Sequence, residues 1–388
     1  MKILLKTLVA VLSITTLNAC NVNSKTEVID LAISKTVIET PSISNKPEIK
    51  VALLLDTSNS MDGLIDQAKA QLWKIVNALS YAKCEDENPN LKIAVYEYGN
   101  DNLNADEGYL RQVLNFSDDL DEISKSLFSL TTRGGNEYCG KVIQTALTQL
   151  NWGNNTKDLN LIFIAGNEAY TQGNVSYKEA SKLAHKNEVS VNTIFCGDYD
   201  QGIPGYWKDG ADLTHGNYMA IDQNVATVHV ASPYDDRIIE LYKKLNKTYV
   251  AFGSQGRQKK EMQADQDANA MGYNKANAVS RTVSKSSRLY KNSSWDLVDA
   301  EKEESFSYDD LDKNELPKEL KGKSKSEIKS YITKKSKERD TLQNAITELN
   351  NKRKEFIIKI TSDTNNGLEN AMIEAIKIQA KKKNYKWD

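Results

Sequence analysis

Val51-Ala52-Leu53-Leu54-Leu55 is followed without a break by Asp56-Thr57-Ser58-Asn59-Ser60-Met61, so that five apolar residues lead into a polar, turn-prone run. A short continuous apolar stretch with such borders is typical of a buried parallel strand. Residues 63–82 have the pattern of a helix, which makes 56–61 a strand-to-helix loop. In open α/β sheets these loops carry the binding site. We therefore predict an α/β fold with a candidate site at this loop.

The loop offers oxygen ligands. Asp56, Ser58 and Ser60 supply one carboxylate and two hydroxyls at alternate positions, which suits Mg2+, Mn2+ or Ca2+ rather than zinc. Few ligands leave coordination positions open, and a weakly charged set keeps the ion electrophilic, so a carboxylate from a partner protein could complete the octahedron. The alternative is that Asp56 and Ser58 only cap the following helix. Capping explains either residue but not the whole arrangement, which favours a metal-binding loop.

The same residues, followed by Met61, resemble the first loop of the metal-ion-dependent adhesion site (MIDAS) of von Willebrand factor type A (VWA) domains. The resemblance runs from Ile49 to Phe252. It implies a Rossmann-like, mostly parallel central sheet with helices on both faces. A hydrolytic function would need a nucleophile and a base that the sequence does not show, so we expect a ligand-binding protein rather than an enzyme. The corresponding segments are the strand Leu91–Gly99, the Gly-Gly loop Thr131–Glu137, the central strand Leu159–Ala165, the fifth strand Ser190–Gly197 and the entry to the sixth strand, His215–Tyr218.

The second and third loops depart from the family pattern. In the family a Thr usually follows the Gly-Gly pair and supplies a hydroxyl ligand, whereas here Asn136 and Glu137 follow. The ligand from this loop would then be the amide oxygen of Asn136, the carboxylate of Glu137, or the hydroxyl of Thr131 or Thr132. The third loop has Gly166 where the family usually has Asp, and Glu168 or Asn167 could substitute through a water molecule. The cofactor that the resemblance implies is Mg2+, with Mn2+ or Ca2+ as alternatives. The expected ligands are Asp56, Ser58, Ser60, Asn136, Glu137 and Glu168.

The amino terminus has the pattern of a targeting segment. Lys2 and Lys6 precede the apolar run 7–14, and Leu17-Asn18-Ala19-Cys20 resembles the lipobox of a bacterial lipoprotein. We predict a signal peptide over 1–19, lipidation of Cys20 and a flexible tether over 20–48. The alternative is an uncleaved or conventionally cleaved signal. The predicted location is the bacterial cell envelope, on a lipid-anchored protein that faces the periplasm or the cell surface.

Export would place three further cysteines in an oxidising compartment. We predict a disulfide between Cys139 and Cys196, because both lie near the carboxyl edge of the sheet, with Cys84 at the opposite edge. The alternative is three free buried thiols. The histidines His185, His215 and His229 lack Cys or Glu at ligand spacing, so no zinc centre is expected.

The 388 residues are enough for two or three domains, and a net charge of -2 with 39% hydrophobic residues is ordinary for a soluble protein. After the VWA-like region we predict a helical connector over 253–310 and an antiparallel helical hairpin or coiled coil over 311–388. The pattern includes a closing helix at 234–249, a helix at 259–285, a capping box at Ser324 and Glu327, and a second apolar stripe from Leu368.

The carboxyl-terminal region is basic. Residues 318–388 hold 18 Lys and Arg against 10 Asp and Glu. A solvated Lys-rich helix face is the commoner interpretation, and the alternative is contact with an anionic surface such as phospholipid or acidic polysaccharide. No nucleic-acid partner is expected.

Two hypotheses for the function follow. The first is a membrane-anchored binding protein that engages a protein or glycan ligand through the MIDAS-like loops, while the helical tail associates with a partner or with itself. The second is a metal-independent structural or assembly factor of the envelope that acts through its helical tail. The aromatic residues of the loop 202–210 could line a partner surface, although packing is their commoner role.

Overall fold

The predicted α/β fold is confirmed by the computed structural model, which describes residues 46–222, 224, 230–360 and 368–387. The predicted signal peptide, Cys20 and nearly all of the tether lie outside the described residues, as does His229. The central sheet has the strand order β4-β3-β1-β5-β6-β7, with only β4 antiparallel to its neighbour. The strands of the two sheets are β1 (Glu48–Asp56), β2 (Ala82–Cys84), β3 (Asn90–Tyr98), β4 (Leu110–Ser117), β5 (Leu159–Gly166), β6 (Ser190–Cys196), β7 (Tyr218–Ile221) and β8 (Tyr385–Trp387).

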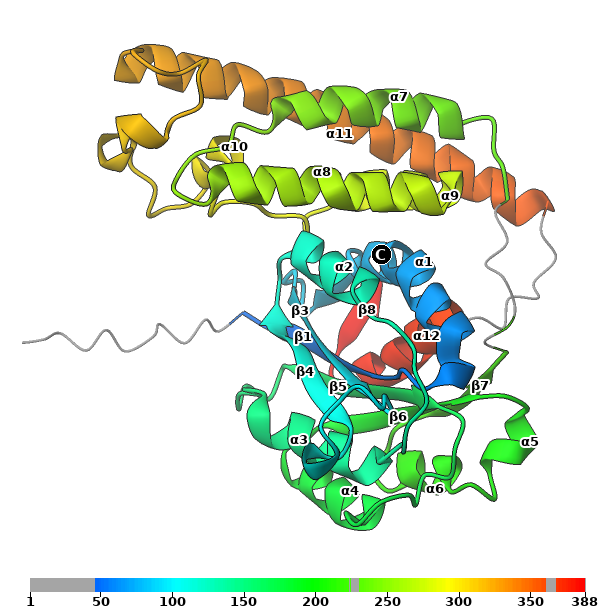
Figure 1. Ribbon diagram of the computed structural model, residues 1–388. Helices are drawn as coiled ribbons and strands as arrows, with labels where there is room; N and C mark the ends of the chain where they lie inside the picture. The colour runs from blue at the N-terminus through cyan, green and yellow to red at the C-terminus, as the bar shows by residue number, and fades with distance from the viewer. Residues whose placement is uncertain (1–45, 223, 225–229, 361–367, 388) are drawn as a thin grey trace, which may run out of the picture. The chain divides into compact units, whose positions relative to one another are not determined.

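Helices cover both faces of the sheet, and Figure 1 shows α1, α2 and α12 on one face with α3, α4 and α6 on the other. The α-helices are α1 (Asp62–Leu79), α2 (Leu120–Phe128), α3 (Cys139–Gln149), α4 (Tyr177–Lys186), α5 (Tyr199–Gly202), α6 (Trp207–Asp212), α7 (Asp235–Leu245), α8 (Gly256–Tyr273), α9 (Lys275–Ser284), α10 (Leu297–Ala300), α11 (Lys325–Ile360) and α12 (Leu368–Lys381). Short 3-10 turns are η1 (Asn59–Met61), η2 (Ala105–Glu107), η3 (Asn246–Thr248), η4 (Tyr308–Asp310) and η5 (Lys313–Glu315).

The apolar run of β1 is buried from both sides, as expected for a central parallel strand. Val51, Leu53 and Leu55 pack with α1, α2 and α12, whereas Ala52 and Leu54 pack with α3 and α4. This alternation follows from the two-residue period of a strand. It holds β1 in one register between β3 and β5, which fixes the position of the loop that begins at Asp56.

The last helix completes the α/β domain, so the predicted hairpin between the two carboxyl-terminal helices is not formed. α12 packs on α1, β5 and β7, and β8 pairs with β2. The residues between β7 and α12 form a separate layer of helices α7–α11, here called the helical layer (235–360). The α/β domain is therefore discontinuous in sequence, and the predicted closing helix at 234–249 belongs to the helical layer as α7. The apolar stripe from Leu368 was correctly found, but its partner is the sheet.

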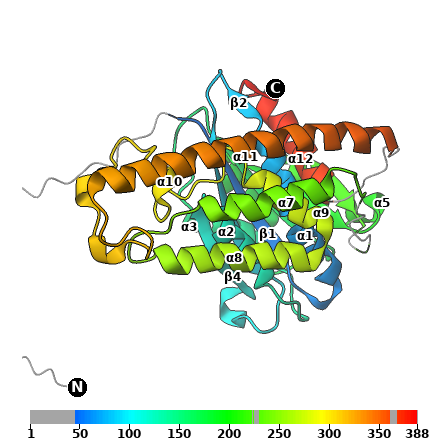
Figure 2. The same cartoon turned by 90° about the horizontal axis from the view of Figure 1, so that it is seen from above.

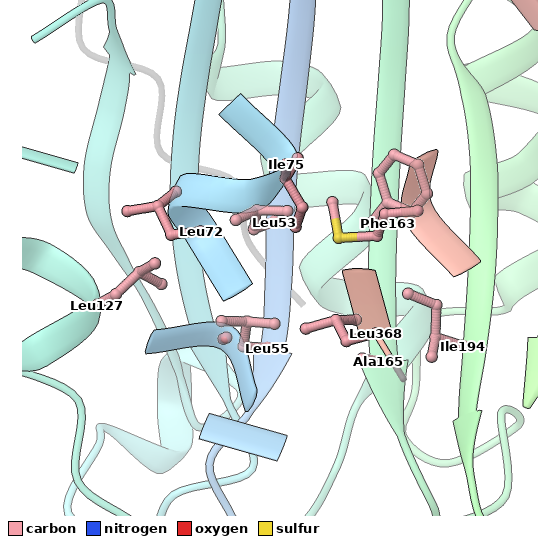
Figure 3. A pocket seen from close by; sticks show the side chains of 11 residues that line it. Leu53, Leu55, Leu72, Ile75, Leu127, Phe163, Ala165, Ile194 and Leu368 are labelled. Atoms are coloured by element: carbon pink, nitrogen blue, oxygen red, sulfur yellow. The ribbon is translucent and has the colours of Figure 1, made fainter. Parts of the chain in front are cut away.

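A small apolar cavity marks where α12 closes the core. Its walls come from the sheet, from α1 and α2, and from Leu368 and Met372 of α12 (Figure 3). The cavity volume is about 20 Å³, close to the smallest space that holds a water molecule, and its hydrocarbon walls offer that water no hydrogen bond. The other lining residues are Leu53, Leu55, Ala68, Leu72, Ile75, Leu127, Phe163, Ala165 and Ile194.

The helical layer is joined to the α/β domain by buried polar contacts. Arg281 of α9 lies 2.8 Å from a carboxylate oxygen of Asp121 in α2, and both side chains are almost fully buried. Ser124 of α2 donates a hydrogen bond to Gln266 of α8 at 2.9 Å. α7 and α11 run side by side in the same layer (Figures 1 and 2). The helical layer is thus part of one folded unit with the α/β domain, rather than a free tail.

Two local predictions in the helical layer can be compared with the structure. Ser324 and Glu327 form the predicted capping box, since Glu327 accepts from the Ser324 backbone N–H at 2.8 Å and from its hydroxyl at 2.7 Å. The predicted helix at 259–285 is two helices, α8 and α9. The break is at Asn274, whose extended backbone ends α8 and whose side chain accepts from the backbone N–H of Asn277 to begin α9. No helix among the described residues is both long and apolar enough to span a bilayer.

Candidate functional site

The first loop places its three predicted ligands together. Asp56 ends β1 and is fully buried, and its Oδ1 accepts a hydrogen bond from the backbone N–H of Ser58 at 2.7 Å. The hydroxyl oxygens of Ser58 and Ser60 are 3.2 Å apart. Neither η1 nor α1 has a side-chain cap, so the helix-capping alternative for Asp56 and Ser58 does not hold. The loop presents a carboxylate and two hydroxyls at one point.

The second loop brings Glu137 into the same site. Its side chain is 3% exposed and its carboxyl lies beside that of Asp56, close enough for the two to share a proton, with the Ser58 hydroxyl also in reach. The position depends on Gly135, because a Cβ there would come within 2.7 Å of the backbone oxygen of Gly99. Glu137 thus takes the place that the sequence left open after the Gly-Gly pair.

Both carboxyls are electrostatically unfavourable in their ionised forms. Burial raises the pKa of Asp56 well above its ordinary value, and the adjacent Glu137 charge raises it further. Burial also raises the pKa of Glu137, with a contribution from the charge of Glu168. Apart from a proton shared with Glu137, the buried Oδ2 of Asp56 has no hydrogen-bond partner among the described residues. A proton or a cation is needed to satisfy this pair.

Two glycines form the walls of the site, and sequence reasoning singled out only Gly166, as the residue in place of the usual Asp. Gly99, with φ +77°, follows β3, and a Cβ there would lie 2.6 Å from Oδ1 of Asp56 and 2.9 Å from Cγ of Glu137. At Gly166 a Cβ would lie 2.6 Å from the hydroxyl of Tyr98 and 3.2 Å from the ring of Trp207. The usual aspartate of the third loop is therefore excluded here by packing. For Gly99 the available sequence signal was a glycine directly after the strand β3.

The other predicted ligands are less close. Asn136 is exposed, and Glu168 is exposed with its carboxylate accepting from Gln172 at 3.3 Å. The backbone N–H of Glu168 donates to Glu137 at 3.3 Å, so the third loop supports the second. Asn167 reaches the first loop through a 3.2 Å hydrogen bond to the Ser60 hydroxyl. Thr132 is hydrogen-bonded to Asp62 and does not serve as the missing hydroxyl ligand.

The residues present fit a hard divalent cation. The site offers only oxygen ligands, from Asp56, Glu137, Ser58 and Ser60. Oδ2 of Asp56 is buried and would be stabilised by a cation. Two carboxylates would neutralise a divalent ion, and Ser60 is exposed, so one side of the site is open to solvent. Oxygen ligands of this kind suit Mg2+, Mn2+ or Ca2+. No cluster of three or more His, Cys, Asp or Glu side chains at metal-binding distance occurs among the residues that the structure places.

The predicted Cys139–Cys196 disulfide is not formed. Cys84, Cys139 and Cys196 are all free and buried. Cys139 packs in the core on the α3 side of the sheet, whereas Cys196 packs in the core on the α1 side, so the sheet separates the two thiols. Burial raises the pKa of both thiols, which disfavours the reactive thiolate. The second loop is held by packing and hydrogen bonds instead.

The structure places two of the histidines together. The rings of His185 and His215 are 5.8 Å apart between centroids, in an edge-to-face arrangement. They lie far apart in sequence, and α4 and the end of α6 bring them together. Around this pair, as elsewhere in the described part of the chain, no cluster of three or more His, Cys, Asp or Glu side chains at metal-binding distance is found.

No curated protein matches the sequence. Among solved structures, the chain is similar to the conserved hypothetical protein BatB from Bacteroides thetaiotaomicron, with 17% identity, a TM-score of 0.35, and coverage of 45% of this chain and 90% of that one. A von Willebrand factor type A protein from Catenulispora acidiphila has 15% identity and a TM-score of 0.34, with 45% of this chain and 39% of that chain covered.

Proximal thread matrix protein 1 from the mussel byssus, whose structure has a zinc-occupied MIDAS motif, has 14% identity and a TM-score of 0.34, with 45% and 42% covered. The chain thus spans about two fifths of the length of these last two structures. With TM-scores below 0.5, none of these likenesses bears on function. Residues 50–202 match the family model described as von Willebrand factor type A domain, and this part of the chain is therefore a VWA domain.

Proposed function

We propose that the chain is a lipid-anchored binding protein of the bacterial cell envelope that engages its ligand through the loops around Asp56 with a divalent cation, Mg2+ first, in the site. VWA domains are ligand-binding adhesion domains that often carry a MIDAS. The observation that carries the proposal is the buried Asp56–Glu137 carboxyl pair beside the hydroxyls of Ser58 and Ser60.

The chain's own residues define what each part of the site would do. Asp56 and Glu137 would hold the cation from its buried side, and Ser58 and Ser60 from the solvent side. The cation would supply a fixed positive charge and open coordination positions at the sheet edge. Asn167 positions Ser60 by hydrogen bonding, and Gly99 and Gly166 leave room for the carboxyls. These are binding roles, and the proposal includes no catalytic step.

Thermal unfolding of the full chain in Mg2+, Mn2+, Ca2+ or chelator tests the proposal. A ligand that binds only the folded state at a hundred times its Kd should add about 2.7 kcal/mol to the free energy of unfolding. Asp56→Asn and Glu137→Gln should each abolish most of this gain, whereas Asp106→Asn, at an exposed position, should keep it. Identical melting of the unmutated chain in all four conditions would instead favour the metal-independent assembly role, with a shared proton in place of the cation.

The anchor has its own test. Cys20→Ser removes the thiol that would accept the lipid, so the variant should leave the membrane fraction. Extraction of this variant only by detergent would contradict the lipoprotein assignment and indicate an uncleaved signal helix.

A further inference from the structure

Close to the three loops of the candidate metal site, a short segment exposes large apolar side chains. Tyr199 is 49% exposed, Ile203 41% and Tyr206 48%. These three residues, with the exposed Pro204, are here called the 199–206 patch. Single exposed apolar residues are ordinary on a protein surface, but a group of them within eight residues is a feature of interaction sites.

The patch is held in one conformation. Tyr206 has a left-handed backbone with φ +66°, which is uncommon for a bulky residue and clusters at functional positions. Its backbone N–H donates to the oxygen of Ile203, and its own oxygen accepts from Gly210, both at 3.0 Å. The hydroxyl of Tyr218 donates to the backbone oxygen of Tyr199 at 2.5 Å. A partner would therefore meet preorganised side chains, which lowers the entropy cost of association.

Hydrogen bonds connect the patch to the third loop of the candidate site. Trp207 follows Tyr206 directly, and its indole N–H donates to the backbone oxygen of Glu168 at 2.7 Å. The backbone N–H of Tyr170 donates to the oxygen of Gly205 at 2.9 Å. Because the buried Trp207 ring also borders Gly166, the segment that carries the patch packs directly on the loops around Asp56.

The charges around the patch are negative. Residues 198–212 contain Asp198, Asp200, Asp209 and Asp212 against a single lysine, Lys208, which is paired with Asp212 at 2.6 Å. Glu168 is exposed on the adjoining loop. Within the site itself, the two carboxylates of Asp56 and Glu137 would neutralise a divalent cation. A carboxylate from the partner is therefore not needed to balance the charge of the ion. The surroundings therefore favour a cationic partner over an acidic one.

We propose that the 199–206 patch docks a basic segment of another protein, whose aromatic or aliphatic side chains pack against Tyr199, Ile203 and Tyr206 while its Arg or Lys side chains face Asp198 and Asp200. This inference rests on the proposed function and names its ligand class as protein rather than glycan. Tyrosines in such positions are typical anchors of protein interfaces, and the acidic rim disfavours acidic polysaccharides.

Three fluorescent peptides of about twelve residues provide the probe: alternating Arg and Trp, alternating Arg and Ser, and alternating Glu and Trp. Binding to the full chain is measured by fluorescence anisotropy, in Mg2+ and in chelator. The Arg–Trp peptide should bind at least tenfold more tightly than the other two. A variant with Ile203→Ser and Tyr206→Asn should lose at least tenfold in its affinity, since Asn tolerates the left-handed backbone while removing the ring.

Two single variants separate docking from folding. Asp200→Lys keeps the apolar side chains and reverses one exposed charge, and it should weaken Arg–Trp binding at least threefold. Ile378→Ser changes a residue of α12 that is equally exposed, at 49%, and should leave binding unchanged. The melting temperature of each variant shows whether it is folded.

Four outcomes would overturn the inference. Two concern the peptides: the double variant binds the Arg–Trp peptide as tightly as the unmutated chain does, or the Glu–Trp peptide binds most tightly. The third is that a neutral oligosaccharide binds in a patch-dependent way while none of the peptides binds, and the fourth is that light scattering shows a dimer of the unmutated chain that the double variant does not form. The last would assign the patch to a second copy of the chain. Peptide binding measured in chelator depends on the patch alone. If divalent cations do not change the melting temperature, the proposed cation is contradicted, but the proposed basic protein partner is not.

Discussion

The carboxyl of Glu137 lies beside that of Asp56 with both side chains almost excluded from solvent, at 3% and 0% exposure. Two ionised carboxylates in such a place repel each other, and burial penalises both charges. The chain therefore has a site that is stable when a proton or a cation is present and strained when neither is.

Stability in chelator should fall as the pH rises above the ordinary carboxyl pKa values of the unfolded chain. Burial raises the pKa of both Asp56 and Glu137 in the folded state, and the charge of Glu137 raises the pKa of Asp56 further. A carboxyl whose pKa is higher in the folded state than in the unfolded state stabilises the fold while it is protonated. This contribution is fully present below the unfolded-state pKa, near 4, and is lost as the pH rises through the folded-state pKa. Asp56→Asn with Glu137→Gln should flatten this slope, and Mg2+ should reduce it in the unmutated chain. Denaturant titrations across the pH range measure it. An equal slope in the double variant would show that other groups cause it.

Restoring the usual aspartate of the third loop should destabilise the fold. Even the Cβ of Gly166→Ala would lie 2.6 Å from the hydroxyl of Tyr98, so either Gly166→Ala or Gly166→Asp should cost about 1–3 kcal/mol through overpacking. Gly272→Ala is the matched control, because its Cβ would have open space within α8 and should stabilise by up to about 1 kcal/mol. Chemical denaturation compares them. A Gly166→Asp variant with unchanged stability would mean that the Tyr98 and Trp207 wall can move.

Removal of the buried guanidinium between the α/β domain and the helical layer should be severe. Arg281 pairs with Asp121 at 2.8 Å and with Asp267 at 2.5 Å, and all three side chains are at most 4% exposed. Arg281→Met leaves two buried carboxylates short of a partner, which typically costs about 3–5 kcal/mol. Arg237→Met, which breaks an exposed pair with Glu240, should change stability by no more than about 0.5 kcal/mol. Equal urea midpoints for both variants would contradict the buried network.

Two isoleucines of α12 test where that helix packs. Ile376 is fully buried against the α/β core, and Ile378 is 49% exposed on the same helix. Ile376→Ala should cost about 2–5 kcal/mol, whereas Ile378→Ala should cost no more than about 0.5 kcal/mol. The loss at Ile376 should appear in hydrogen exchange of β5 and α1, since these elements meet α12. Protection lost only in α11 would instead indicate the hairpin that the sequence pattern suggested.

The elements that could be predicted are those with a local signature. The apolar run of β1, the polar loop after it and the capping box at Ser324 each depend on residues close in sequence, and each is present in the structure. The partner of α12 could not be predicted in this way. A stripe of apolar residues states only that one helix face is buried, and α11 and the sheet were equally compatible with it.

The cysteine prediction failed for a reason that the sequence did contain. Successive residues of a strand face opposite sides of the sheet, so Cys196 shares its face with Ile194, toward α1. α3, which carries Cys139, covers the other face. Proximity to the same sheet edge was therefore not enough. Glu137 was among the expected ligands, but its closeness to Asp56 depends on Gly99 and Gly135, whose backbones approach each other only in the folded chain.

The return of the chain to the sheet through α12 and β8 also sets the order in which the protein can be completed during synthesis. Leu55 and Leu368 line the same cavity, yet they are separated by roughly 300 residues, which a ribosome adds at about 5–20 residues per second. For some 15 to 60 s the α1-side face of β1 and β5 lacks its final cover. The nascent chain should therefore stay dependent on holding factors until residues 368–387 have emerged, and premature stop codons anywhere before Leu368 should give aggregation rather than a shortened working domain.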